Sequence, residues 1–309
     1  HLNRGYLAVN GHLNVADPDS GEATFPLQHG AGASGYGTFL ISPTGGWVYK
    51  ADNNQAAIQQ LGAGSPPLTD SFVIHSADGT QHTLTVTIQG TNDAPVAQAQ
   101  TQSVTEDGSL LNGQMVATDV DTGDTLTYSP PAQQVAGFTL NPDGSYTFDP
   151  TDQAYQHLAD GQTQKVTIPV TVTDSHGSSS TQNLDITITG TNDAPTVTGA
   201  TTLAAGTEDT SVTLHENDLL QHATDVDTTD ALAVQNLSTD HGTITDNKDG
   251  SFSFTPDKHY SGPVQLTYNI TDGHGGTVQT SASMILAATG DAALITGQDT
   301  GDVSESKYQ

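Results

Sequence analysis

The chain has 309 residues, of which 35 are acidic and only 6 are basic, so its formal net charge is −29 at neutral pH. This charge repels nucleic acid and anionic membrane surfaces, so we expect neither as a partner, and it suits a protein that collects cations. Cysteine is absent, which excludes a disulfide framework, a zinc ribbon and a thiol nucleophile, and no apolar stretch approaches the roughly 18 residues of a membrane span.

A repeated string, Gly-Thr-Asn-Asp-Ala-Pro, divides the chain at 90–95 and again at 190–195. Each copy follows a run of alternating Thr and aliphatic residues, at 83–88 and 185–189, and a weaker copy occurs at 290–293. A period of about 100 residues is the size of a small domain rather than of a solenoid turn. We therefore predict domains at 1–92, 93–192 and 193–288, with 289–309 as the first strand of a following unit.

The first unit has the pattern of a β-sandwich that lacks its opening strand. An acidic turn around Asp17 and Asp19 precedes an alternating segment that contains Trp47 and Tyr49, and a last strand is predicted at 83–88. Alternation of apolar and polar residues is typical of a half-buried strand, so Trp47 is expected to pack into the core. The opening strand and the Glu-Asp turn of the other two units have no counterpart here.

The second unit shows the complete pattern, and the third repeats it. Abundant Thr, Gly, Ser and Asn favour strands joined by turns, and Asn-Pro-Asp-Gly at 141–144 is a strong turn signal. Strands are predicted at 95–104, 110–118, 145–148, 166–173 and 184–189. Several short strands of this kind predict an antiparallel sandwich of the immunoglobulin type. The predicted fold class is thus all-β, with tandem immunoglobulin-like (cadherin-like) sandwiches in an extended rod.

The pieces missing from the first unit occur at the other end of the chain. Residues 293–295 and 301–305 resemble the start of a unit, comparable with 103–106, and would complete 1–92 if placed before residue 1. Either the chain is one period of a tandem array, or the tail of one molecule fills the strand position of the next. The remaining alternative is a disordered tail with a frayed first domain. We expect neighbouring copies or repeats to join head to tail through 293–305.

The acidic turns occupy matched positions in successive units. In an immunoglobulin-like sandwich, the loop after the second strand and the last hairpin loop lie at the end where the chain enters, beside the linker. The Glu-Asp turn after the first strand lies at the far end, next to the following linker. Carboxylate and amide oxygens gathered in this way are what Ca²⁺ prefers, and an EF-hand is excluded because the glycine is one place early and the closing Glu is missing. The candidate Ca²⁺ ligands are Asn92, Asp93, Asp119, Asp121, Asp174, Glu106, Asp107, Asn192, Asp193, Asp225, Asp227, Asp272, Glu208, Asp209, Asp291, Asp17, Asp19 and Glu305.

Taken together, these motifs resemble the VCBS and bacterial cadherin-like repeats of large RTX-type surface adhesins. The resemblance is carried by the segments 90–95, 103–107, 117–121, 141–148 and 172–174. It implies a calcium-stiffened stalk or filament segment, secreted to the bacterial surface, that serves adhesion or biofilm attachment. The first unit is similar to a VCBS repeat and the third to the cadherin-like subclass.

Three other functions fit parts of the sequence less well than a stalk does. The sequence lacks the motifs of hydrolases, P-loop proteins, dinucleotide-binding proteins and zinc proteases. His176 and His274 fall in equivalent turns of successive units, which indicates turn residues rather than a unique catalytic site. We therefore expect that the chain is not an enzyme. A glycan- or protein-binding module is the alternative, and the Gly/Ala/Ser-rich loop at 28–37 would be its contact or simply a mobile loop. A covalent crosslink from Lys50 or Lys165 is a third alternative.

Overall fold

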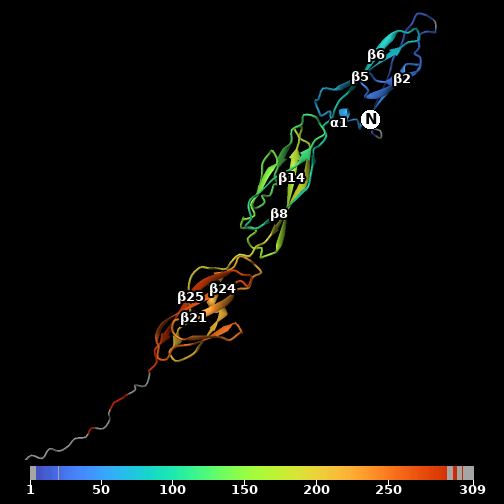
Figure 1. The fold of residues 1–309 in the computed structure, drawn as a ribbon. Coiled ribbons are helices and arrows are strands. Elements are labelled where there is room, and N and C mark those ends of the chain that lie inside the picture. Colours follow the sequence, from blue (N-terminus) through green and yellow to red (C-terminus); the bar gives the residue numbers. More distant parts are fainter. Residues whose placement is uncertain (1–4, 20, 291–294, 298–300, 302–309) are drawn as a thin grey trace, which may run out of the picture. The chain divides into compact units, whose positions relative to one another are not determined.

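The computed structural model describes residues 5–19, 21–290, 295–297 and 301. The described chain is almost entirely β-strand (Figure 1), which confirms the predicted all-β class. Its two helices, α1 (Ala56–Gln59) and α2 (Glu216–Leu219), are single turns, and no helix in this described part has the length and apolar character needed to cross a bilayer. The chain forms two compact units, 1–104 with 108–152 and 165–188, and 105–107 with 153–164 and 189–309.

The first sandwich packs a four-stranded antiparallel sheet against a hairpin. The sheet has the order β1-β4-β3-β2, built from β1 (Tyr6–His12), β4 (Gly46–Asp52), β3 (Gly37–Ile41) and β2 (Gln28–Ala31). The hairpin consists of β5 (Leu68–His75) and β6 (Gln81–Ile88). Alternate residues of both layers point inward, and the buried set includes Ile41, Tyr49, Phe72, Ile74 and Ile88. Trp47 is half-buried against this core, as expected.

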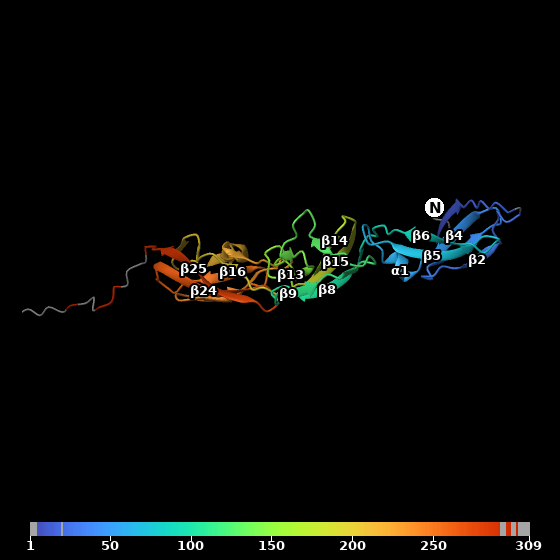
Figure 2. The same cartoon turned by 90° about the horizontal axis from the view of Figure 1, so that it is seen from above.

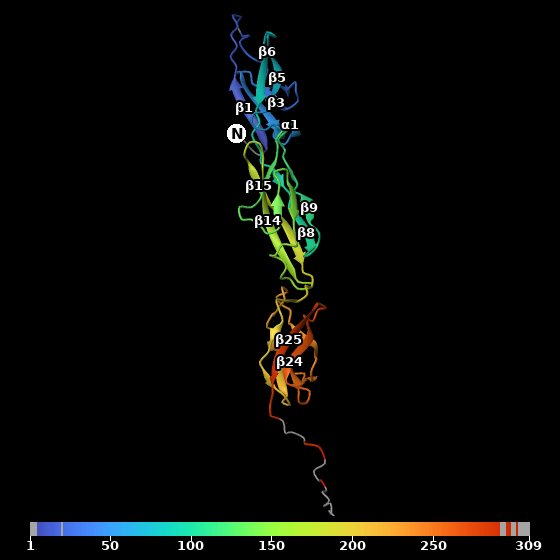
Figure 3. The same ribbon diagram turned by 90° about the vertical axis from the view of Figure 1, so that its left-hand side faces the viewer.

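The second sandwich contains β7 to β15. One sheet has the order β11-β14-β15-β8, with β11 (Thr127–Ser129), β14 (Thr163–Thr173), β15 (Ser179–Thr189) and β8 (Gln100–Thr105). The other has the order β12-β13-β9, with β12 (Phe138–Leu140), β13 (Ser145–Phe148) and β9 (Leu111–Gln114). Figure 3 shows β14 and β15 side by side. A short pair joins β7 (Val96–Ala97) to β10 (Ala117–Thr118).

Two predicted strands of this sandwich are each divided in the structure. The segment 95–104 forms β7 and β8, and the segment 110–118 forms β9 and β10. The division arises because each segment changes partner halfway, since β7 pairs with β10 while β8 lies beside β15 and β9 beside β13. The prediction of single strands was therefore wrong, although the residues involved are extended.

The third sandwich repeats this plan. Its larger sheet has the order β17-β25-β24-β21, with β17 (Thr201–Thr202), β25 (Thr277–Ala287), β24 (Gly262–Thr271) and β21 (Ala233–Thr239), and β18 (Gly206–Thr207) also pairs with β25. Figure 2 shows β24 and β25 next to each other. A smaller sheet joins β19 (Val212–His215), β23 (Ser251–Thr255) and β22 (Thr243–Asp246), and β16 (Thr196–Val197) pairs with β20 (Ala223–Thr224). The fully buried Phe254, Val264, Leu266 and Ile270 lie at its centre.

The last hairpin strand of each sandwich has a different neighbour on its outer edge. β15 is flanked by β8, and β25 is flanked by β17 and β18, which run parallel to it. Within the described residues, the equivalent strand β6 pairs only with β5. Most of the segment 293–305, which we predicted to supply the missing strand, lies outside the described residues.

Candidate metal centres

A cluster of three carboxylates forms in the second compact unit (105–107, 153–164 and 189–309), where the linker follows β15. Glu106 follows β8, its N–H donates to the Thr189 carbonyl at 2.9 Å, and its Oε1 accepts the Thr191 N–H at 2.8 Å. Asp227, after β20, accepts the Asp193 N–H on Oδ2 at 2.9 Å. Oxygens of Glu106, Asp193 and Asp227 all lie within 4.8 Å of one another. Two oxygens bound to one Ca²⁺ at about 2.4 Å are separated by at most about 4.8 Å, so the three can share one ion.

The cluster buries more oxygen atoms than the surrounding hydrogen-bond donors satisfy. Glu106 is 1% exposed and Asp227 is 2% exposed. Burial, and then the neighbouring carboxylates, raise the pKa values of Glu106, Asp193 and Asp227. Five buried oxygens of the centre have no hydrogen-bond partner among the described residues: Glu106 Oε2, Asn192 Oδ1, Asp193 Oδ2, Asp225 Oδ2 and Asp227 Oδ1. Unpaired buried carboxylates are costly, and a cation is the group that would satisfy all of these oxygens at once.

An equivalent cluster occurs in the first unit. The Asp93 N–H donates to Asp121 Oδ2 at 2.7 Å, and the Asp121 N–H donates to Asp119 Oδ1 at 3.0 Å. Within the part of the chain that the structure describes, Asn92 Oδ1, Asp119 Oδ2 and Asp121 Oδ1 are buried without a hydrogen-bond partner, at the same positions as in the second unit. Burial raises the pKa of Asp121, and the nearby Asp93 and Asp119 raise it further. No described residue supplies a glutamate to this cluster.

The predicted ligands Asp174 and Asp272 hold the linker asparagines. Asp174 Oδ2 accepts a hydrogen bond from Asn92 Nδ2 at 2.7 Å, and Asp272 Oδ2 accepts one from Asn192 Nδ2 at 3.0 Å. The other oxygen of each carboxylate accepts backbone N–H groups of its own hairpin turn, from His176 and Ser178 or from residues 274–276. Burial alone would raise both pKa values, but these hydrogen bonds lower them. Both aspartates thus fix the amide nitrogen of a linker asparagine, which determines the orientation of that side chain.

Two further aspartates belong to these loops and were missed from the sequence. The Asp124 side chain is 5% exposed and accepts from His176 Nδ1 at 3.1 Å, and the Asp230 side chain is 1% exposed and lies 3.0 Å from His274 Nδ1. The Asp124 hydrogen bond raises the pKa of His176. The sequence contained a signal for both residues, because the spacing Asp-x-Asp-x-x-Asp occurs at 119–124 and again at 225–230. Both histidines lie in equivalent turns.

The Glu-Asp turns repeat at the ends of β8 and β18. Glu208, which is 4% exposed, accepts the Thr289 N–H, as Glu106 accepts that of Thr191. The following Asp107 and Asp209 adopt left-handed backbone conformations, with φ of 55° and 57°. Both are exposed. Asp107 Oδ2 accepts the Thr191 hydroxyl at 3.4 Å and its charge contributes to the raised pKa of Asp193, whereas Asp209 Oδ1 accepts the His259 N–H at 3.0 Å.

The predicted ligands Asp17 and Asp19 form a separate turn with Glu22, in which the Asp19 N–H donates to Asp17 Oδ1 at 2.7 Å. Oxygens of these three residues lie within 4.8 Å of one another, which makes the turn a further group that could hold a cation. Asp291 and Glu305 lie outside the described residues.

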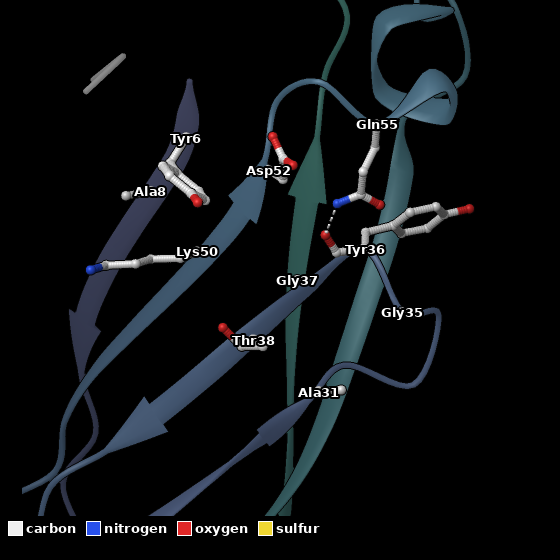
Figure 4. A pocket seen from close by; sticks show the side chains of 10 residues that line it. All are labelled: Tyr6, Ala8, Ala31, Gly35, Tyr36, Gly37, Thr38, Lys50, Asp52 and Gln55. Carbon is white, nitrogen blue, oxygen red and sulfur yellow. Dashed lines mark hydrogen bonds between the residues drawn. The ribbon is translucent and has the colours of Figure 1, made fainter. Parts of the chain in front are cut away.

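A cavity of about 560 Å³ lies on the outer face of the first sheet (Figure 4). Tyr6 on β1, Lys50 and Asp52 on β4, and Gln55 before α1 line it, and Gln55 Nε2 donates to the Tyr36 carbonyl at 2.6 Å. This is the surface at which the alternative, ligand-binding function would reside.

The loop beside this cavity is anchored. Asp70 on β5 is fully buried and accepts the N–H groups of Ser34 and Gly37 at 2.9 and 3.1 Å and the Tyr49 hydroxyl at 3.1 Å. Burial, followed by the Asp70 hydrogen bond and charge, raises the pKa of Tyr49. A Cβ on Gly32 would overlap the Asp70 carboxylate, so glycine is required there. The prediction of a loop over the whole of 28–37 was therefore wrong, because Gln28–Ala31 forms β2, and the buried Asp70 carboxylate holds backbone N–H groups of the remainder.

The fold and the acidic linkers define the class, which is tandem cadherin-type β-sandwiches with carboxylates gathered at the linkers. The family model of the bacterial cadherin-like domain matches residues 3–90 and 92–190, and that of the cadherin-like domain matches 191–287. The chain therefore belongs to the bacterial cadherin-like domain family. Modules of this family are typically structural rather than enzymatic, and their ectodomain fold fits an extracellular location.

Solved structures show the same fold. Domains EC22–24 of mouse cadherin-23 align with a TM-score of 0.53 at 13% identity, over 88% of this chain and 89% of that chain. Domains 1–4 of protocadherin gamma B7 align with a TM-score of 0.50 at 17% identity, over 90% and 71% of the two chains. No curated protein matches the chain in sequence.

Proposed function

We propose that the chain is a calcium-stiffened structural segment of a bacterial extracellular adhesin, secreted to the cell surface. The observation that carries this proposal is the matched set of buried, unpartnered oxygens on Asn92, Asp119 and Asp121 and, in the next repeat, on Asn192, Asp225 and Asp227. Two chemically identical sets at equivalent positions indicate a role that the repeats share, and only hard oxygen donors are offered, which favours Ca²⁺.

Calcium would act on the linkers. In the second unit the ligand oxygens come from three places in the chain: Glu106 after β8, Asp193 in the linker and Asp227 after β20. An ion bound to all three would offset the repulsion between the carboxylates. It would also restrict rotation of the linker, because the linker would be held to two other segments of the chain. The cationic charge is the chemistry that the metal supplies, and the stalk role follows from the restricted bending of the linker.

Neighbouring copies or repeats would join head to tail through residues 293–305. Among the described residues no strand covers the outer edge of β6, whereas strands cover the same edge in the other two sandwiches, and this difference supports the assembly. Mechanical continuity between repeats, rather than catalysis or nucleic-acid binding, is then the function of this segment.

The test is a calcium titration of the whole chain by calorimetry, with small-angle scattering recorded in calcium and in EDTA. We expect calcium to raise the unfolding temperature and to narrow the range of conformations seen by scattering. Asp193→Ala should reduce the scattering response, because it removes a ligand of only one of the two centres, while the circular dichroism of the sandwiches stays unchanged. An exposed-site variant, Asp52→Asn, is the control. A wild-type chain whose unfolding temperature and scattering ignore calcium would refute the proposal.

A further inference from the structure

A groove crosses the outer face of the first sheet, which is built from β1 to β4. Two cavities of about 560 Å³ each lie there, and Ala31, Thr38 and Lys50 line both of them, so the cavities are continuous. In the strand register, Lys50 on β4 lies opposite Ala8 on β1 and Thr38 on β3 (Figure 4). Thr38 in turn lies opposite Ala31 on β2. Since neighbouring strands are about 4.8 Å apart, this row of small side chains around one lysine forms a floor about 14 Å long.

Larger side chains border this floor on both sides. Val48 and Leu40, which form the next outward-facing row along the strands, line the second cavity. On the opposite side, Tyr6 on β1 lines the first cavity and is 54% exposed. Each cavity is within the range of small-ligand sites, about 300 to 1,000 Å³, and such sites combine aromatic side chains with a few polar groups. The outer face of this sheet is therefore shaped to hold an elongated ligand across the strands.

The loop at 32–36 forms one wall of the groove and is held by side chains from other parts of the sandwich. The buried Asp70 accepts two N–H groups, one from this loop and one from its junction with β3. Gln55 Nε2 donates to the Tyr36 carbonyl at 2.6 Å, a contact drawn in Figure 4. A wall that is already ordered lowers the conformational entropy that ligand binding costs. The groove is therefore preorganised.

Lys50 is the charged group on the floor of the groove that has no carboxylate partner within the described part of the chain. By contrast, Lys165 on β14 pairs with Asp185 at 2.8 Å. Asp52, the carboxylate that lines the same cavity, accepts the N–H and the Nδ2 of Asn54 at 2.9 and 3.0 Å. In a chain with a net charge of −29, an unpaired ammonium group in a preformed groove favours a ligand that carries a negative charge.

We propose that this groove binds a glycan whose sugar rings carry carboxylates, that is, a polymer of the uronic acid class. The Lys50 ammonium group pairs with a ring carboxylate, and the exposed ring of Tyr6 packs against the apolar face of a neighbouring sugar. The Thr38 hydroxyl hydrogen-bonds to a sugar hydroxyl. The segment then has an adhesive surface of its own, in addition to the proposed structural function, and this surface does not depend on calcium.

The shape and charge of the groove favour a glycan over other anionic ligands. The groove lies on the face of the sheet, so it offers side-chain groups, whereas an extended peptide commonly adds to the free backbone groups of a sheet edge. A single lysine on the floor suits widely spaced charges with hydroxyl groups between them. A densely charged polyanion would meet repulsion from the acidic remainder of the chain.

The experiment is calorimetry of the full chain with hexasaccharides of galacturonate, of mannuronate and of hyaluronan, and with the neutral cellohexaose. EDTA is present, because calcium could bridge an acidic protein and an acidic sugar. We expect at least one carboxylated hexasaccharide to bind at least tenfold more tightly than cellohexaose. Lys50→Met and Tyr6→Ala should each weaken this binding at least tenfold. Lys165→Met removes the same charge from another sandwich and is the matched control, and circular dichroism and Trp47 fluorescence check that the variants fold.

Several results would overturn the inference. They are the absence of binding by all three carboxylated hexasaccharides, equal binding of cellohexaose, and equal losses in Lys50→Met and Lys165→Met. A hexaglutamate peptide that competes as well as the sugars would show that the groove takes acidic peptides, and it would reject the glycan assignment. A calcium titration of the same chain reports on the proposed function separately, so calcium binding without sugar binding would reject this inference alone.

Discussion

Glu106 Oε1 accepts the backbone N–H of Thr191 at 2.8 Å, which ties the turn after β8 to the linker that follows β15. The same contact joins Glu208 to Thr289 in the next repeat. In each repeat a buried glutamate carboxylate thus holds the backbone N–H of a threonine at the start of the linker. For Glu106, the second oxygen is buried without a partner beside Asp193.

Replacement of Glu106 by glutamine separates its two roles. The amide oxygen of Gln can still accept the Thr191 N–H, so the sandwich should stay folded, but the negative charge that faces Asp193 and Asp227 is lost. We expect calcium affinity at this centre to fall at least tenfold, or about 1.4 kcal/mol. Calorimetry measures the affinity, and Asp52→Asn, an exposed position outside the acidic clusters, is the control. An unchanged affinity would remove Glu106 from the ligand set.

The raised pKa of Asp227 predicts an inverted pH dependence in the calcium-free chain. The folded state holds this proton more tightly than the unfolded state, whose carboxyl pKa is about 4. As the pH rises from about 4 through the folded-state pKa, the folded chain loses that proton, and the free energy of unfolding falls. Asp227→Asn cannot titrate, so in EDTA it should be more stable than wild type at pH 7, and the gap should close as the pH is lowered toward 4.

Calcium should reverse the order of these two proteins. Wild type gains stability from the bound ion, whereas Asp227→Asn has lost a ligand and gains less. Thermal unfolding in calcium and in EDTA, at pH 4, 5 and 7, gives the comparison directly. If Asp227→Asn is the less stable protein in EDTA at pH 7, the carboxylate is stabilising without a metal, and the electrostatic argument is wrong.

The buried Asp70 predicts a stability loss confined to the first sandwich. It accepts hydrogen bonds from the loop N–H groups of Ser34 and Gly37, and Asp70→Ala leaves these donors unpaired. Hydrogen bonds to a charged group contribute about 1.5 to 3 kcal/mol each, so we expect a loss of about 3 kcal/mol. Trp47 is the single tryptophan, so its fluorescence follows unfolding of this sandwich alone. Asp52→Asn, at the surface, should leave the transition unchanged.

The sequence was sufficient to place the acidic residues together, because strand alternation and sandwich connectivity determine which turns share an end. Asp119 and Asp121 could be assigned to the linker at Asp93 on that basis, and the structure brings their atoms within hydrogen-bond distance. Whether they bind a metal stays a prediction. The division of 95–104 into β7 and β8 could not be predicted, because the alternation is the same on both sides of the change of partner.

Other features depended on partners far away in the chain. Asp174 stays a predicted metal ligand, but its hydrogen bonds from Asn92 Nδ2 and from the His176 N–H are not shown by any local sequence pattern. Asp70 lies in an ordinary alternating strand, and its role emerges only from the loop 36 residues earlier that it holds. Asp124 was overlooked because a third acid in a turn is common, and only its burial beside His176 distinguishes it.

The glycine of the linker string at 90–95 and 190–195 lies against backbone in both copies. A Cβ on Gly190 would lie 2.2 Å from the Leu158 carbonyl oxygen, and one on Gly90 would lie 2.0 Å from that of Leu61. Both contacts are with backbone, so the linker would have to move away and carry the Thr and Asp that follow out of position. We expect Gly190→Ala to cost about 2 kcal/mol and to weaken calcium binding at the second centre, because overpacking of this kind costs about 1 to 3 kcal/mol. Gly199→Ala is the control, since no atom lies within 4 Å of its Cβ position. Equal unfolding temperatures and calcium affinities for the two variants would show that the glycine is not required by this contact.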